Sequence, residues 1–174
     1  DLLIHLAAQV AVTTSCKDPK YDFDVNALGT FNLLESIRNY SASTFFINAS
    51  TNKVYGKLHS LRIRQETNSY SYPDLPRGIS EQQQLDFYSP YGCSKGIADQ
   101  YTLDYARIYG LSTCSLRQSC IYGPFQYGVE DQGWVSWFTI AALRSAKITI
   151  YGTGYQTRDL LYVNDLCACY LELY

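Results

Sequence analysis

Three side chains of this sequence have the types and spacing needed to move a proton together with a hydride. Tyr91 and Lys95 are four residues apart, so on a helix they lie on one face. Thr51 follows an apolar, β-branched run that is typical of a strand. A free tyrosine, with a pKa of about 10, is a poor base at neutral pH. A nearby ammonium and a helix N-terminus would favour the phenolate, so we expect Tyr91 to act as the acid/base.

A proton taken from a carbinol is useful only if a hydride also leaves the carbon. None of the side chains in this sequence can accept a hydride, so the three residues imply a nicotinamide cofactor. The spacing Tyr-x-x-x-Lys is by itself common in a chain with 17 tyrosines. The interpretation therefore depends on the order of the elements and motifs around it.

The elements that must position these residues alternate along the chain. Apolar and periodic runs predict strands at 2–6, 44–49, 112–116, 148–151 and 158–163, and helices at 18–40, 89–109, 134–146 and from Asn164, which can cap the last one. Asp18-Pro19 and Ser89-Pro90 are typical helix starts, and Gly110 is typical of a helix end. This order predicts right-handed βαβ units and an α/β, Rossmann-like, doubly wound parallel sheet, in which ligands bind beyond the carboxyl ends of the strands.

Six short motifs occur in order along almost the whole chain. They are His5-Leu6-Ala7-Ala8, Asn26-Ala27-Leu28-Gly29-Thr30, Ser50-Thr51 with Val54-Tyr55-Gly56, Tyr91 with Lys95, Arg117 with Tyr122-Gly123-Pro124, and Arg158-Asp159 with Tyr162-Val163 and Asp165. Together they resemble the extended short-chain dehydrogenase/reductase family, which contains the NAD-dependent sugar-nucleotide epimerases and dehydratases. The resemblance implies NAD as the cofactor and a nucleotide sugar as the substrate.

The resemblance also implies roles for individual residues. The expected catalytic residues are Tyr91, Lys95 and Thr51. The expected cofactor-binding residues are Leu6, Ala7, Ala8, Gln9, Asn26, Ser50, Tyr91, Lys95 and Ser119. The expected substrate-binding residues are Thr51, Asn52, Gln118, Cys120 and Arg158, with the Arg158 guanidinium on a nucleotide phosphate. No metal ligands are expected. His5 is expected to be a packed strand residue with a backbone partner.

Departures from the family pattern narrow the expected reaction. Sugar-nucleotide 4,6-dehydratases carry Thr-Asp-Glu where this chain has Thr51-Asn52-Lys53, so elimination of water is not expected. The strings 89–107 and 117–134, including Cys120 in place of the usual Asn, resemble the branch that epimerises CDP-dideoxyhexoses at C2 through a transient 2-keto sugar. A 4-epimerase acting on another nucleotide sugar and a non-catalytic NAD-binding scaffold remain as alternatives.

The composition of the chain limits which partners it is expected to bind and where in the cell it is expected to occur. The formal net charge is −2 and no basic block occurs, so a nucleic-acid surface is not expected. No apolar run approaches the roughly 18 residues that span a bilayer, so we expect no membrane contact. The six cysteines have no metal-site spacing and indicate free thiols, so we expect a cytoplasmic protein. The family resemblance suggests a homodimer or homotetramer built through helices 19–40 and 89–109.

The glycine-rich fingerprint of the family and its ribose-binding acidic residue are not found in this chain, so we expect a fragment. Residues 1–123 are predicted to form the C-terminal half of the NAD-binding domain, with an insertion at 57–88. Residues 124–174 are predicted to form part of a small substrate-binding region and a returning strand and helix. Alone, the chain is expected to bind NAD weakly.

Overall fold

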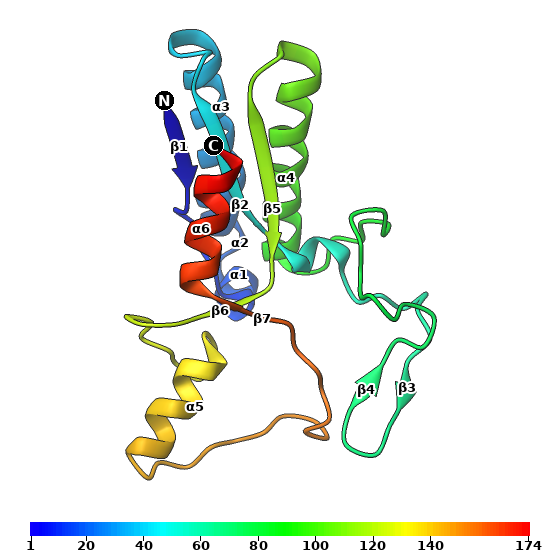
Figure 1. Ribbon diagram of the computed structural model, residues 1–174. Coiled ribbons are helices and arrows are strands. Elements are labelled where there is room, and N and C mark those ends of the chain that lie inside the picture. The colour runs from blue at the N-terminus through cyan, green and yellow to red at the C-terminus, as the bar shows by residue number, and fades with distance from the viewer.

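A computed structural model describes residues 1–174 and shows an α/β arrangement (Figure 1). Its main sheet has three parallel strands in the order β1-β2-β5: β1 (Leu2–His5), β2 (Phe45–Thr51) and β5 (Thr113–Gln118). Leu2 is in register with Phe45, and Phe46 is in register with Thr113. The predicted parallel sheet is therefore confirmed, with β2 in the centre.

Helices cover both faces of this sheet. Along the chain they are α1 (Val12–Lys17), α2 (Pro19–Phe23), a π-helical segment (Asp24–Leu28), α3 (Gly29–Tyr40), α4 (Ser89–Tyr109), α5 (Trp134–Leu143) and α6 (Val163–Leu173). Figure 1 shows α3 and α4 behind the sheet and α6 in front of it. The neighbours Phe46 and Ile47 of β2 are both fully buried but point to opposite faces, as alternation along a strand requires.

Each face of the sheet has its own apolar core. Behind the sheet, Phe46 packs with Leu34 and Ile37 of α3 and with Tyr105 and Leu111. In front of the sheet, Ile47 packs with Leu166 and Tyr170 of α6. The two cores fix the sheet between its helices, so the carboxyl ends of the strands have fixed positions relative to α4.

Short elements extend from the carboxyl edge of the sheet. A 3₁₀ segment (Asn52–Tyr55) follows β2, and the 57–88 insertion contains only the two-residue strands β3 (Arg64–Gln65) and β4 (Tyr70–Ser71). Beyond β5, strand β6 (Cys120–Tyr122) pairs in parallel with β7 (Leu160–Tyr162). No helix is long and apolar enough to cross a membrane.

The helix starts are mostly as predicted. Asp18 accepts a hydrogen bond from the Tyr21 N–H at 2.9 Å, and Gly110 ends α4 in the left-handed conformation. Ser89 lies inside the first turn of α4, with φ of +72°, and its hydroxyl accepts from the Gly92 N–H at 3.2 Å. Its capping interaction is therefore present, although the residue that precedes the helix is Tyr88.

Other predicted elements are wrong. Helix α1 was not expected, and residues 18–40 form two α-helices joined by a π-helical turn instead of one helix. Residues 148–151 form no strand because no neighbouring strand pairs with them, and the side chain of Tyr151 is exposed. Asn164 does not cap α6, since the helix begins one residue earlier, at Val163.

Candidate active site

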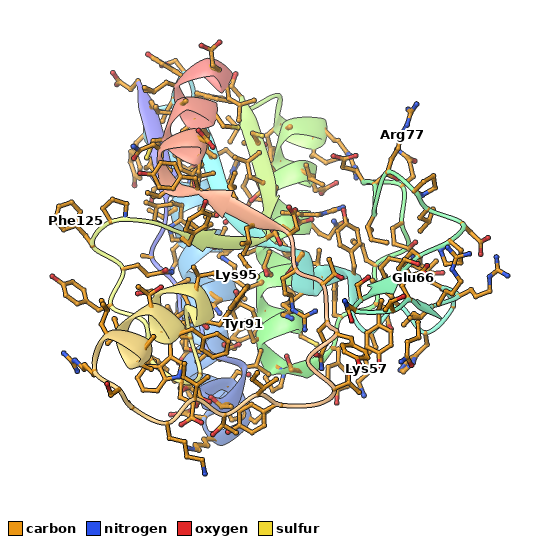
Figure 2. The ribbon with its side chains drawn as sticks, turned by 60° about the horizontal axis from the view of Figure 1, so that its bottom comes forward. Lys57, Glu66, Arg77, Tyr91, Lys95 and Phe125 are labelled. Carbon is orange, nitrogen blue, oxygen red and sulfur yellow. The ribbon has the colours of Figure 1, made fainter.

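An open cleft of about 1690 Å³ lies beyond the carboxyl ends of β1, β2 and β5. It brings together most of the predicted site residues, namely Leu6, Ala8, Ser50, Thr51, Asn52, Tyr91, Lys95, Gln118, Ser119, Cys120 and Arg158. Figure 2 shows Tyr91 and Lys95 close together in the middle of the molecule, whereas Lys57, Glu66 and Arg77 lie apart on the 57–88 insertion. The cleft is therefore the candidate active site.

Tyr91 is buried in the first turns of α4, and its phenol is hydrogen-bonded to Thr51 at the end of β2. Burial raises the pKa of Tyr91, and the charge of Asp22 adds to this, while the hydrogen bond with Thr51 lowers it. The acid/base role of Tyr91 stays a prediction, and the net direction of its pKa is upward. The physical reason is that desolvation of the buried phenol outweighs the groups that would favour its charge.

Lys95 is only 4% exposed, and its Nζ donates a hydrogen bond to the Ala49 carbonyl oxygen at 2.6 Å. Burial lowers the pKa of Lys95 to about 8, although the nearby carboxylates of Asp99 and Asp22 oppose this shift. An ammonium has three N–H donors, of which Ala49 uses one. Two donors therefore remain for a ligand in the cleft.

A buried ion pair supports the floor of the cleft. Asp99, one turn beyond Lys95, accepts two hydrogen bonds from the Arg117 guanidinium, at 2.9 and 3.1 Å. The hydroxyls of Ser50 and Ser115 also donate to Asp99, at 2.7 and 2.9 Å. Burial alone would raise the pKa of Asp99, but these donors outweigh it and lower the pKa. Asp99 was not predicted, although its i+4 spacing from Lys95 places it on the same helix face.

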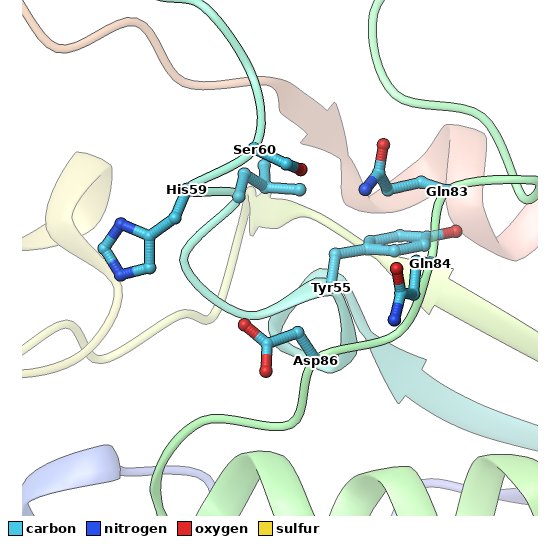
Figure 3. A pocket seen from close by; sticks show the side chains of 7 residues that line it. Tyr55, His59, Ser60, Gln83, Gln84 and Asp86 are labelled. Carbon is cyan, nitrogen blue, oxygen red and sulfur yellow. The ribbon is translucent and has the colours of Figure 1, made fainter.

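Arg117 also connects the cleft to a second cavity. Its Nη1 donates to the Tyr55 hydroxyl at 3.0 Å. Tyr55 lines both the cleft and a smaller cavity of about 250 Å³ (Figure 3). The other residues around this smaller cavity are Leu58, His59, Ser60, Gln83, Gln84 and Asp86. None of them was predicted as a site residue.

Three predicted cofactor-binding residues, Ala7, Gln9 and Asn26, do not line the cleft. Gln9 and Asn26 are buried beneath it, where the Gln9 N–H donates to Asn26 Oδ1 at 2.8 Å. Asn26 Nδ2 in turn donates to the Gln9 carbonyl and to the side chains of Asp22 and Ser94. The structure therefore places these two side chains in a supporting polar cluster, and a direct cofactor contact stays a prediction.

Two of the predicted substrate residues, Cys120 and Arg158, lie on the segments around β6 and β7, whereas Thr51, Asn52 and Gln118 lie at or just after the ends of β2 and β5. Arg158 is exposed, forms no salt bridge, and donates only to the Thr157 carbonyl oxygen. Its charge is therefore free for an anion. Ser119 donates to the Asp159 carbonyl at 2.9 Å and so joins the two strands. His5 is buried as predicted, but its partner is the Thr30 side chain at 3.1 Å, not a backbone group.

Comparison with known proteins identifies the family. Residues 1–174 match the description "NAD dependent epimerase/dehydratase family". The chain belongs to this family. It is 48% identical to CDP-paratose 2-epimerase from Salmonella typhi over 98% of this chain, and 34% identical to a putative UDP-glucose 4-epimerase from Methanocaldococcus jannaschii over 95% of it. The two matches cover 52% and 49% of those proteins, so the chain spans about half the length of the curated relatives it matches.

Solved structures of family members have the same fold. The UDP-glucose 4-epimerase from Thermotoga maritima, solved with UDP-glucose, has a TM-score of 0.78 and 32% identity, covering 98% of this chain and 50% of that one. The UDP-glucose 4-epimerase from Thermus thermophilus, solved with NAD, also has a TM-score of 0.78 and 32% identity, covering 99% and 53%. The Rossmann-like fold predicted from the sequence is therefore confirmed.

NAD is the cofactor of this family, and the donors in the cleft fit its nicotinamide-ribose end. The two N–H groups of Lys95 that Ala49 does not use match the two ribose hydroxyls of such a nucleotide. The small side chain of Ala8 and the end of β1 leave room beside them. The arrangement can hold a proton at Tyr91, orient a hydroxyl at Thr51 and keep a cation at Lys95.

Proposed function

We propose that the protein containing this chain is a sugar-nucleotide epimerase that interconverts CDP-paratose and CDP-tyvelose by inverting C2. The observation that carries this proposal is the 48% identity to a CDP-paratose 2-epimerase along almost the whole chain. Seven relatives that are 4-epimerases or dehydratases are 28–34% identical. Asn52 and Lys53 in the cleft supply no carboxyl group for the elimination of water.

In the proposed mechanism the side chains of the protein transfer a proton and orient the substrate. Thr51 orients the C2 hydroxyl, and Tyr91 removes its proton at the phenol oxygen and later returns it. Burial raises the pKa of Tyr91, so we propose that the charge of Lys95 offsets part of this cost when the phenol gives up its proton. NAD, when bound, would supply a reversible acceptor for the C2 hydride, which keeps the overall reaction redox-neutral. Inversion requires the transient 2-keto sugar to turn over within the cleft.

The substrate edge of the cleft is proposed to bind the nucleotide. Arg158 offers an uncommitted guanidinium, whose planar fork suits a diphosphate. Gln118 and Cys120 also line the cleft and are proposed to contact the sugar. Residues 124–174 then belong to the substrate-binding part of the protein. We also propose a homodimer or homotetramer, in which exposed aromatic side chains of α3 and α4, such as Phe31 and Tyr101, contact another copy.

The proposal is tested with the complete reading frame in which this sequence occurs. Incubation with CDP-paratose and NAD, followed by proton NMR of the sugar couplings, should show an equilibrium of two C2 epimers without net NADH release. No conversion by a protein that holds NAD would favour the second candidate, a 4-epimerase on another nucleotide sugar. The similarity to UDP-glucose 4-epimerases supports that candidate. Absence of both conversion and NAD binding would favour a non-catalytic scaffold.

The acid/base assignment is tested by Tyr91→Phe. This change removes the proton carrier but keeps the ring that packs at the start of α4, so turnover should fall by about 10²- to 10⁴-fold while the Kd for NAD stays within a few-fold. Steady-state kinetics and a fluorescence titration with NAD measure the two effects. Tyr88→Phe is the matched control, because Tyr88 is exposed and does not line the cleft. Near-normal turnover by Tyr91→Phe would contradict the assignment.

A further inference from the structure

A carboxylate outside the predicted site lies beneath the catalytic pair. Asp22 of α2 is 0% exposed and forms no salt bridge. It accepts hydrogen bonds from Gln9 Nε2 at 2.7 Å, from Asn26 Nδ2 at 3.2 Å and from the Ser94 hydroxyl. Burying a carboxylate without an ion pair is costly, even when it is hydrogen-bonded. A buried, unpaired carboxylate such as Asp22 is therefore expected to have a role that offsets this cost.

The donors to Asp22 come from three different parts of the chain. Gln9 belongs to the loop after β1, Asn26 to the π-helical turn, and Ser94 to α4. Ser94 lies between Tyr91 and Lys95, and its hydroxyl also contacts the Tyr91 carbonyl at 3.2 Å. Asp22 thus ties the helix turn that carries both catalytic residues to the wall of the cleft beside β1.

The charge of Asp22 acts on both of these residues. It raises the pKa of Tyr91 and opposes the lowering of the pKa of Lys95 by burial. The other ionisable groups around Lys95 are Tyr91 and Asp99 of α4 and His5 of β1. Asp99 is already matched by the Arg117 guanidinium of β5. Of the two carboxylates near Lys95, Asp22 is therefore the one that forms no direct ion pair with an arginine or lysine side chain.

We propose that Asp22 is a positioning residue of the active site, which fixes the start of α4 through Ser94 and, beside Asp99, contributes negative charge next to the Lys95 ammonium. The proposal rests on the proposed roles of Tyr91 and Lys95. A purely structural residue at this place would need only hydrogen-bond acceptors, which an amide also offers. The distinguishing property of Asp22 is its charge.

The test replaces Asp22 by asparagine in the complete reading frame, because Asp22→Asn keeps the shape and removes the charge. Loss of a negative charge lowers the pKa of both Lys95 and Tyr91. Both limbs of the pH profile of kcat/KM should therefore move to lower pH, by roughly half a unit or more. Asp24→Asn is the matched control, since Asp24 lies two residues away and pairs with Lys20 at the surface. Unmoved limbs in Asp22→Asn would overturn the proposal.

A second readout does not need turnover. Carbamylation of Lys95 by cyanate, followed by peptide mass spectrometry, depends on the fraction of neutral amine. Asp22→Asn should react about threefold faster than the wild type at pH 7, which corresponds to half a pH unit, and equally fast at pH 10. A difference that persists at pH 10 would show loosened packing instead and would overturn the charge role. This readout still decides the inference if the wild type converts no CDP sugar, an outcome that counts only against the proposed function.

Ser94→Ala tests the link between Asp22 and α4, and it does so even if Asp22→Asn does not fold. Ser94→Ala removes the link to α4 and leaves the carboxylate in place. We expect turnover to fall about tenfold, because the catalytic turn is no longer fixed, with the limbs of the pH profile unchanged. Full activity of Ser94→Ala would contradict the positioning role of Asp22.

Discussion

Lys95, the proposed catalytic lysine, is a residue at which burial opposes the charge that its role requires. The ordinary pKa of a lysine is 10.5, and burial lowers the pKa of Lys95 to about 8. The folded protein therefore bears a cost for keeping this side chain charged at neutral pH, on the order of 3 kcal/mol. The hydrogen bond to the Ala49 carbonyl offsets part of this cost, by about 1.5–3 kcal/mol for a charged donor. A residue retained at such a cost is expected to serve function.

Lys95→Met should therefore abolish turnover without lowering the melting temperature at pH 7. Between pH 8 and 10.5 the unfolded chain binds more protons than the folded wild type, so wild-type stability rises with pH in this window, relative to Lys95→Met. Thermal melts at pH 7 and pH 10 measure the change. Lys147→Met, at an exposed position, is the control and should shift neither value. A Lys95→Met protein that melts well below the wild type at pH 7 would contradict this account.

The sequence was informative for residues whose role is tied to spacing. Thr51, Tyr91 and Lys95 could be predicted because a strand end and one helix face must bring them together, and the structure places all three in one cleft. Asp22 and Asp99 could not, because an acidic residue on a helix is usually a solvated surface group. Only the packing of α4 between other elements shows that both are buried.

At the scale of elements, α4 is fixed to the sheet by the Asp99–Arg117 pair. Arg117→Met should cost about 3–5 kcal/mol of unfolding free energy, because it leaves the Asp99 carboxylate buried without its partner. The deficit should shrink as the pH falls, because without Arg117 burial raises the pKa of Asp99, so the variant takes up a proton there before the wild type does. Urea unfolding at pH 7 and pH 4.5 measures both effects.

The control for this change is Arg62→Met. Arg62 pairs with Asp74 at the surface, with both side chains largely exposed, so its loss should cost less than about 1 kcal/mol. Equal losses for Arg117→Met and Arg62→Met would show that burial of the α4–β5 pair contributes nothing, and that α4 is held by apolar packing alone.

The 57–88 insertion depends on one glycine at its start. Gly56 has φ of +66°, and a Cβ at this position would lie 1.9 Å from the Asp86 carbonyl oxygen at the other end of the insertion. Gly56→Ala should therefore destabilise the protein by about 2 kcal/mol or more and speed proteolysis within the insertion. Gly78→Ala shares the positive φ but meets no atom within 4 Å, so it should cost only about 1 kcal/mol. Similar melting temperatures for the two variants would contradict the contact.

The elements themselves were predictable to different degrees. Strand β2 was predicted closely because its continuous apolar run is a local signal. Helix α4 was predicted closely because Pro90 at its start and Gly110 at its end are also local signals. The segment 148–151 has the apolar composition of a strand but no partner, and pairing is a property of the whole sheet. The π-helical turn at Asp24–Leu28 has no local signal, although it carries Asn26 into the buried cluster with Asp22.

At the scale of the whole molecule, the main sheet has an unpaired edge. Strand β1 pairs with β2 on one side only, and its apolar residues Leu2, Leu3 and Ile4 are partly exposed. Unpaired N–H and C=O groups along such an edge are a template for another strand. The solved relatives that share this fold are about twice as long as this chain.

These 174 residues produced alone should therefore self-associate at micromolar to millimolar concentration, whereas the complete reading frame should form one defined species. Size-exclusion chromatography with light scattering, over a dilution series, distinguishes a concentration-dependent distribution from a fixed oligomer. NAD titration of the same samples should give a Kd at least tenfold weaker for the short chain, since the contacts proposed for Lys95 and its neighbours reach only the nicotinamide-ribose end. A monodisperse short chain that binds NAD as tightly as the complete protein would contradict both expectations and would place the main cofactor contacts within these residues.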